Sequence, residues 1–217
     1  MSGASMDRSS LRFMGGVSAE ISHEVTNVLT VMGELSGLLS DLAAADRAGR
    51  KPLSAEKVLR TAEKLSAQVE RGKTIVRHFN RFAHSADTDQ VLAPLGEMLD
   101  RFAVLARRIA QRRRTEITVV SSDATATMTL DAFALYRLLF DAFDLLSEGY
   151  ETVEISCTPS KAGAEILFRG IDRRPDAVPM QTVSIDRTVS ISGLDADVET
   201  TDDVVRIRLV QGAAGKE

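Results

Sequence analysis

The chain has 217 residues, enough for one large domain or two small ones, and 44% of them are hydrophobic. Its net charge of −4 excludes an overall basic field, so we do not expect nucleic acid as the main partner. The single cysteine, Cys157, excludes an internal disulfide and a cysteine-based zinc site, and its strand-like surroundings predict a core position.

Residues 1–10 are polar and lack the apolar centre of a signal peptide, so we expect a disordered N-terminus. No apolar run in the sequence approaches the roughly 18 residues of a membrane span. These features predict a cytoplasmic protein without a membrane partner.

The first predicted element is a long helix from about Ser9 or Ser10 to about Ala45. Its apolar residues recur every three or four positions and therefore share one stripe. The stripe consists of Phe13, Val17, Ile21, Val25, Val28, Met32, Leu35, Leu39 and Leu42. A helix of this length is typical of a bundle arm rather than of an average globular helix.

His23 lies on the opposite side of this helix. At about 100° per residue it is about 160° away from Val25, so we expect it to face solvent. Glu20 and Asn27 share its face, and Glu24 flanks it. An exposed imidazole beside carboxylates and an amide can act as a nucleophile or a proton carrier.

Charged residues with Gly49 and Pro52 predict a turn, after which a second helix begins near Ser54. The apolar stripe of that helix consists of Val58, Ala62, Leu65, Val69, Gly72, Val76, Phe79 and Phe82. Two long helices with a short connection predict an antiparallel hairpin. One hairpin leaves its stripe half uncovered, so we expect a two-fold homodimer that forms a four-helix bundle.

The segment from His23 to Thr30 resembles the H-box of sensor histidine kinases, in which an acid follows the phosphoacceptor histidine and Asn or Thr follows three positions later. The chain departs from that pattern at Val28, where a proline is usual. The resemblance implies catalytic roles for His23, Glu24 and Asn27. His23 would accept the phosphoryl group, Glu24 (in second place Glu20) would take its Nδ1 proton, and Asn27 would orient water.

A polar, acidic segment over residues 85–90 separates the two halves of the sequence. We place a helical-hairpin dimerisation and phosphotransfer domain at 11–86 and a second domain at 91–212. The second domain begins with a helix over 95–112, and we expect the run Arg112-Arg113-Arg114 to be its solvated end, with a phosphate or receiver contact as the alternative.

The rest of the second domain alternates between strands and one further helix. A helix from Asp131, its N-cap, to about Ser147 follows two strands. The predicted strands cover 116–121, 125–130, 151–158, 164–168, 181–185, 187–191 and 204–210. We expect the acidic run 195–203 to be a solvated loop. This order predicts an α+β sandwich with its helices on one face.

That order is similar to the ATP-binding domain of histidine kinases, and the helix that begins at Asp131 carries the likeness. Asp141 and Leu145 stand where the family has two Asn residues, one of them a magnesium ligand. Phe168 replaces the acid of an Asp-x-Gly-x-Gly turn, and Asp172 replaces its second glycine. The stretch 189–207 has one glycine, Gly193, where a glycine-rich lid and a helix are expected. The resemblance therefore implies a degenerate domain without cofactor or metal of its own.

Together the two resemblances imply a phosphorelay histidine phosphotransferase. It would pass a phosphoryl group between response-regulator receiver domains through His23 without binding ATP, and the receiver would supply Mg²⁺. Thr30, Val31 and Glu34 would contact the receiver. The alternatives are a response-regulator phosphatase that depends on Asn27, a non-catalytic dimeric scaffold, and an active ATP-dependent histidine kinase.

Overall fold

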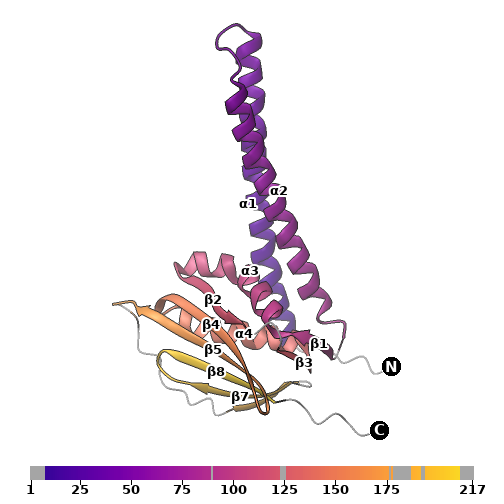
Figure 1. The fold of residues 1–217 in the computed structure, drawn as a ribbon, viewed down its shortest axis with the longest axis vertical. Helices are drawn as coiled ribbons and strands as arrows, with labels where there is room; N and C mark the ends of the chain where they lie inside the picture. Colours follow the sequence, from indigo (N-terminus) through magenta and orange to yellow (C-terminus); the bar gives the residue numbers. More distant parts are fainter. Residues whose placement is uncertain are drawn as a thin grey trace. The chain divides into compact units, whose positions relative to one another are not determined.

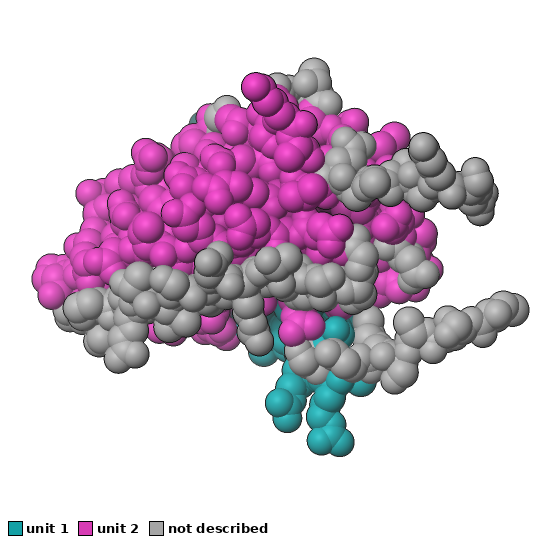
Figure 2. Space-filling view, turned by 90° about the horizontal axis from the view of Figure 1, so that it is seen from below, with its two compact units in different colours: residues 1–80 teal, residues 81–217 magenta. Residues whose placement is uncertain are grey.

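The computed structural model describes residues 8–88, 90–122, 126–175, 177, 187–191 and 194–210. The chain divides into two compact units, residues 1–80 and 81–217, which Figure 2 colours separately. The last turn of the second helix therefore belongs to the second unit.

The first unit is an antiparallel helical hairpin of α1 (Arg8–Arg47) and α2 (Ala55–His84), as Figure 1 shows. Gly49 has a φ of 66° in the turn, and the Asp46 Oδ1 atom accepts a hydrogen bond from the Leu53 amide at 2.9 Å. Ser54 Oγ accepts the Lys57 amide at 3.4 Å and caps α2. The predicted hairpin and its turn are confirmed.

On α1 the helices pack along one edge of the predicted stripe, where Val17, Ile21 and Val28 are buried together with Glu24. On α2 the predicted stripe is wrong as the packed face: Ile75, which lies outside it, is buried, whereas Val76 of the stripe is exposed. The helices approach closely at Gly72, where an added Cβ would lie 3.3 Å from Val28 Cγ1. A second apolar flank stays uncovered in the hairpin, because Leu29 is 60% exposed and Val76 is 44% exposed.

Within the described residues one helix, Ser10–Arg47, is long and apolar enough to cross a membrane by length and composition. This corrects the expectation that no apolar segment is long enough to span a membrane. Its apolar residues fall on a stripe that packs against the strongly charged α2, and it carries Glu24, Glu34 and Asp41. An amphipathic bundle helix explains the same composition.

The second unit contains a six-stranded sheet in the order β2-β4-β5-β8-β7-β6 and a two-stranded sheet of β1 and β3. The strands are β1 (Val91–Pro94), β2 (Glu116–Ser122), β3 (Thr127–Leu130), β4 (Tyr150–Ser160), β5 (Gly163–Arg173), β6 (Arg187–Ile191), β7 (Leu194–Thr200) and β8 (Val204–Val210). β2 runs parallel to β4, and the other pairs are antiparallel.

Helices α3 (Leu95–Arg113) and α4 (Ala132–Ser147) cover one face of the larger sheet (Figure 1). Phe102 of α3 lies at the centre of the core. Its ring centroid is 4.9 Å from that of Phe140 on α4 and 6.0 Å from that of Phe168 on β5. Cys157 is buried in the same core, as its strand position predicts. The predicted arrangement of helices on one face is confirmed.

Asp131 Oδ1 accepts the Ala134 amide at 2.9 Å, so the predicted N-cap of α4 is confirmed.

One arginine, Arg113, joins the end of α3 to the end of α4. Arg113 pairs with Asp144 at 2.5 Å and donates to Ser147 Oγ at 2.5 Å. The expectation of a fully solvated arginine run is therefore wrong for Arg113, whose half-buried side chain ties α3 to the end of α4.

Two strand predictions need correction. Val91–Pro94 forms β1, which pairs with β3 from Val91 opposite Leu130 to Pro94 opposite Thr127. The acidic run predicted as a loop contains β7, where Leu194, Ala196 and Val198 are buried and the acids alternate with them. The strand predicted over 181–185 lies outside the described residues.

Candidate functional site

His23 lies in the first half of α1 and is exposed. The buried residues Ile21 and Val28 fix the rotation of α1 against α2, and His23 is about 140° around the helix axis from Val28. The sequence therefore places the imidazole on the open side of the hairpin because the apolar stripe holds the opposite side.

Two polar residues share this side of α1 with His23. Glu20 lies one turn before the histidine and is half-buried, and Asn27 lies one turn after it and is exposed. A carboxylate, an imidazole and an amide therefore follow one another along one face, as the spacing predicts.

Two threonine hydroxyls that follow His23 on α1 are hydrogen-bonded within the helix. Thr26 Oγ1 donates to the Ser22 carbonyl at 2.8 Å, and Thr30 Oγ1 donates to the Thr26 carbonyl at 2.9 Å. These bonds hold the two hydroxyls against the α1 backbone. The imidazole is thus the strongest nucleophile that the described part of α1 offers on this face.

Glu24 is placed differently from a solvated flanking acid. It is 5% exposed, and its carboxylate accepts a hydrogen bond from the guanidinium of Arg71 on α2. The Arg71 side chain keeps 41% of its surface exposed, so water still reaches the pair. The ion pair anchors the residue next to His23 to the opposite helix.

Arg71 is a functional residue that the sequence patterns considered above do not single out. Helical spacing does indicate its position, since it lies three residues after Gln68 and four before Ile75 and so shares their face toward α1. A charge on a packed face implies a partner of opposite charge across the interface, and Glu24 is that partner.

In the second unit, the resemblance would place nucleotide contacts at Phe168, Asp141 and Leu145. Phe168 is a core residue, whereas the other two are exposed. Phe168 is 0% exposed, and its ring packs edge-on against Phe102. Leu145 is 40% exposed on α4 and offers no oxygen. Neighbouring atoms partly desolvate the Asp141 carboxyl, although the residue is exposed, and this raises its pKa, an effect that Arg137 opposes and Asp144 reinforces.

Packing also explains Gly170. A Cβ on Gly170 would lie 2.4 Å from Cγ of Tyr150, so only glycine lets that ring lie across β5. The Tyr150 hydroxyl donates to the Asp202 carbonyl at 2.9 Å, which fixes the ring in place. Asp172 has a φ of 56°, a left-handed conformation that glycine favours.

These residues do not fit a magnesium nucleotide. Where the resemblance would place an adenine acceptor the chain has a buried phenylalanine, and where it would place an amide ligand the chain has a leucine. The Tyr150 ring fills the space beside Gly170. Among the described residues no group of three His, Cys, Asp or Glu side chains is arranged to hold a metal ion.

No family model matches the sequence, and no curated protein matches it. Among solved structures, the ATP-binding domain of PrrB from Mycobacterium tuberculosis is 22% identical, with 58% of this chain and 100% of that chain covered and a TM-score of 0.39. A bacterial phosphotransferase is 13% identical, with 89% and 94% covered and a TM-score of 0.43. Histidine kinase ThkA in complex with response regulator protein TrrA is 13% identical, with 95% and 64% covered and a TM-score of 0.40. At these identities and TM-scores the likeness carries no argument about function, which therefore depends on the residues of this chain.

Proposed function

We propose that this protein is a phosphorelay histidine phosphotransferase that carries a phosphoryl group on His23 between response-regulator receiver domains, without ATP. The observation that carries the proposal is the exposed imidazole of His23 on the open side of the hairpin, next to a carboxylate that is ion-paired across the two helices. The packed residues at the nucleotide positions of the second unit support transfer from a phosphorylated protein rather than from ATP.

The first step joins a receiver's aspartyl phosphate to His23. The Nε2 lone pair of the neutral imidazole attacks phosphorus in line, the P–N bond forms, and the P–O bond to the aspartate breaks. The aspartate leaves as a carboxylate. The receiver is expected to bring any magnesium ion that balances the phosphoryl charge.

The second step reverses the chemistry on another receiver. A carboxylate oxygen of that receiver's aspartate attacks phosphorus, the P–N bond breaks, and the imidazole is neutral again. An acid near His23 would hold the Nδ1 proton throughout, which keeps Nε2 as the reactive nitrogen. We assign this role to Glu24, with Glu20 on the same face as His23 as the competing group.

The receiver would dock on the side of α1 that carries His23. Val31 is 37% exposed and Leu38 is 47% exposed, and they lie on this side about two and about four turns beyond His23. Thr30 and Glu34 are exposed on the same side. An apolar strip with polar edges is typical of a transient protein interface.

The other flank of the hairpin supports a homodimer. Val25, Leu29 and Met32 of α1 lie about 40–100° past Val28, and Val58, Leu65, Val69 and Val76 of α2 lie about 80–120° past Ile75. Because the two helices are antiparallel and right-handed, both sets face the same side of the hairpin. Pairing with a second copy would cover this flank and leave His23 exposed.

A response-regulator phosphatase is the second candidate, because the exposed Asn27 amide lies one turn from His23 and could orient a water molecule. The two functions separate when phosphorylated receivers are incubated with wild type, His23→Ala and Asn27→Ala. A phosphotransferase takes up label only with His23 present. A phosphatase keeps dephosphorylating receivers in His23→Ala and loses that activity in Asn27→Ala. Labelling from ATP would instead favour a kinase.

A further inference from the structure

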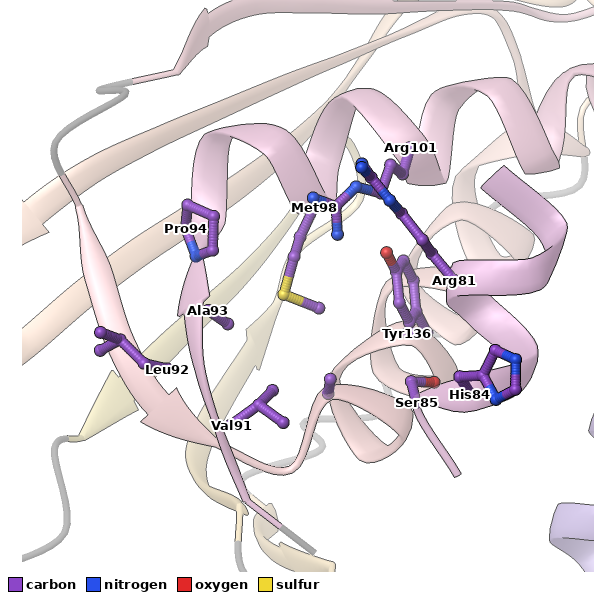
Figure 3. A pocket seen from close by; sticks show the side chains of 11 residues that line it. Arg81, His84, Ser85, Val91, Leu92, Ala93, Pro94, Met98, Arg101 and Tyr136 are labelled. Carbon is purple, nitrogen blue, oxygen red and sulfur yellow. The ribbon is translucent and has the colours of Figure 1, made fainter. Parts of the chain in front are cut away.

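We propose that a cavity in the second unit binds a small organic anion, with a carboxylate or phosphate head group on a short apolar body. The cavity has a volume of about 350 Å³ and lies between the last turn of α2, β1, α3 and the start of α4 (Figure 3). Its walls divide into a cationic end and an apolar end.

Two guanidinium groups converge at the cationic end. Figure 3 shows the side chains of Arg81 from α2 and Arg101 from α3 extending toward each other beside the hydroxyl of Tyr136 from α4. Arg101 pairs with Glu97, whose side chain is 62% exposed, whereas Arg81 has no carboxylate partner among the residues that the structure describes. Neighbouring positive charges repel, and an anion between them would relieve the repulsion.

Tyr136 provides the independent observation that points to a ligand. The residue is 2% exposed, and its hydroxyl makes no hydrogen bond of standard geometry within the described part of the chain. Burial raises the pKa of this phenol, and the charge of Arg101, its hydrogen bond to the hydroxyl and the charge of Arg81 oppose that rise. Because arginine can only donate, the hydroxyl proton has no acceptor, and a head group that accepts it would satisfy this buried group.

The remaining walls are apolar. Met98, Ala93 and Ala132 are buried around the cavity, and Val91 and Pro94 of β1 complete this side. Fixed polar groups at one end and an apolar surface at the other are typical of small-molecule sites, and the volume is at the small end of their range. The occupant is therefore a compact amphipathic anion rather than a bare inorganic ion.

Binding would bridge elements that already touch. The Phe82 ring of α2 packs edge-on against Tyr136 at 5.5 Å and near Phe133 at 6.1 Å. An anion held by both Arg81 and Arg101 would add a polar link between the last turn of α2 and α3. The ligand would thus stiffen the start of the second unit, and this inference is independent of the proposed phosphotransfer.

The test titrates the full chain with phenyl phosphate and phenylacetate, which combine an acidic head with an apolar ring. Inorganic phosphate supplies a phosphate head alone, and benzyl alcohol supplies the ring without a charge. Calorimetry measures affinity. Tyrosine fluorescence in Tyr150→Phe reports on Tyr136, since the chain has two tyrosines and no tryptophan. We expect at least one aromatic anion to bind about tenfold more tightly than inorganic phosphate, with no binding of the alcohol.

Variants locate the site. We expect Arg81→Gln and Arg101→Gln each to weaken binding about tenfold, and Tyr136→Phe to weaken it less. The control is Arg77→Gln, a charge change outside the cavity, which should leave binding unchanged. Circular dichroism confirms that each variant is folded. His23→Ala should bind like wild type, so a failed phosphotransfer would leave this result intact. Failure of both aromatic anions to bind at millimolar concentration, or binding that ignores both arginine changes, would overturn the proposal.

Discussion

The guanidinium of Arg71 on α2 is paired with the buried carboxylate of Glu24 on α1, directly after His23 in the chain. The ion pair links the two helices at the level of the exposed imidazole. It therefore joins the stability of the hairpin to the position of the candidate phosphoacceptor.

Replacing Glu24 by Ala should destabilise the protein by about 1–3 kcal/mol, because it removes a hydrogen bond between charged groups and leaves Arg71 without its partner. The partial exposure of Arg71 keeps the effect below that of a fully buried pair. Urea unfolding measures the change. The control is Glu34→Ala, an exposed charge on the same helix, for which we expect less than about 0.5 kcal/mol.

Glu24→Gln and Glu20→Gln separate the two candidate acids. If Glu24 holds the Nδ1 proton, its glutamine variant transfers phosphate at least about tenfold more slowly, whereas the Glu20 variant stays near wild type. Rates are measured from a phosphorylated receiver under single-turnover conditions. The opposite pattern would move the role to Glu20, which shares the face of His23.

A charge on the uncovered flank of the hairpin should break the proposed dimer. Leu29→Glu with Val76→Glu would place carboxylates in the apolar interface, and sedimentation velocity should then show a monomer at concentrations where wild type is dimeric. Val31→Glu is the matched control on the His23 side. It should leave the dimer intact and slow transfer from the receiver. If Val31→Glu alone dissociated the dimer, the interface would lie on the His23 side instead of the flank of Leu29 and Val76.

Phe168→Ala should destabilise the second unit by about 3–5 kcal/mol, because it opens a cavity beside Phe102 in a fully buried core. Arg169→Ala, the exposed neighbour, should change stability by less than about 0.5 kcal/mol. Thermal unfolding measures both. A mild effect of the Phe168 change would show that this position is not a core position and would reopen it as a ligand position.

Asp141→Asn should stabilise the protein slightly at neutral pH, and the exposure of Asp141 keeps the effect small. Partial desolvation raises the pKa of the folded carboxyl, so ionisation opposes folding above that pKa and has no such effect below the unfolded value, near about 3.9. The difference in melting temperature between variant and wild type should therefore shrink as the pH falls from 7 toward 4. A difference that grows over that range would contradict the sign of the shift.

The helical period predicted the packing of α1 well, because a stripe of Val17, Ile21 and Val28 fixes which side remains for His23. It predicted Glu24 less well, although Glu24 lies between Ile21 and Val28 at helical spacing. A carboxylate is buried only with a partner, and that partner, Arg71, is 47 residues away and invisible to local pattern.

The strand β7 differs from the loop that the sequence predicts, for a related reason. Its acids Asp197 and Glu199 alternate with buried residues and pair with Arg208 on β8, at 3.2 Å and 2.9 Å. Charge density favoured a loop, but the neighbouring strand supplies the counter-charges. The cavity beside Tyr136 likewise cannot be predicted from local sequence patterns, because its walls come from four elements, α2, β1, α3 and α4.

The most direct measurement follows one phosphoryl group. A phosphorylated receiver is mixed with the full-length protein, ³¹P NMR and mass spectrometry locate the group, and a second receiver is then added. We predict an Nε2-phosphohistidine at His23 that forms without ATP and disappears as the second receiver is phosphorylated. Phosphate on another residue, or equal transfer between receivers in His23→Ala, would contradict the account.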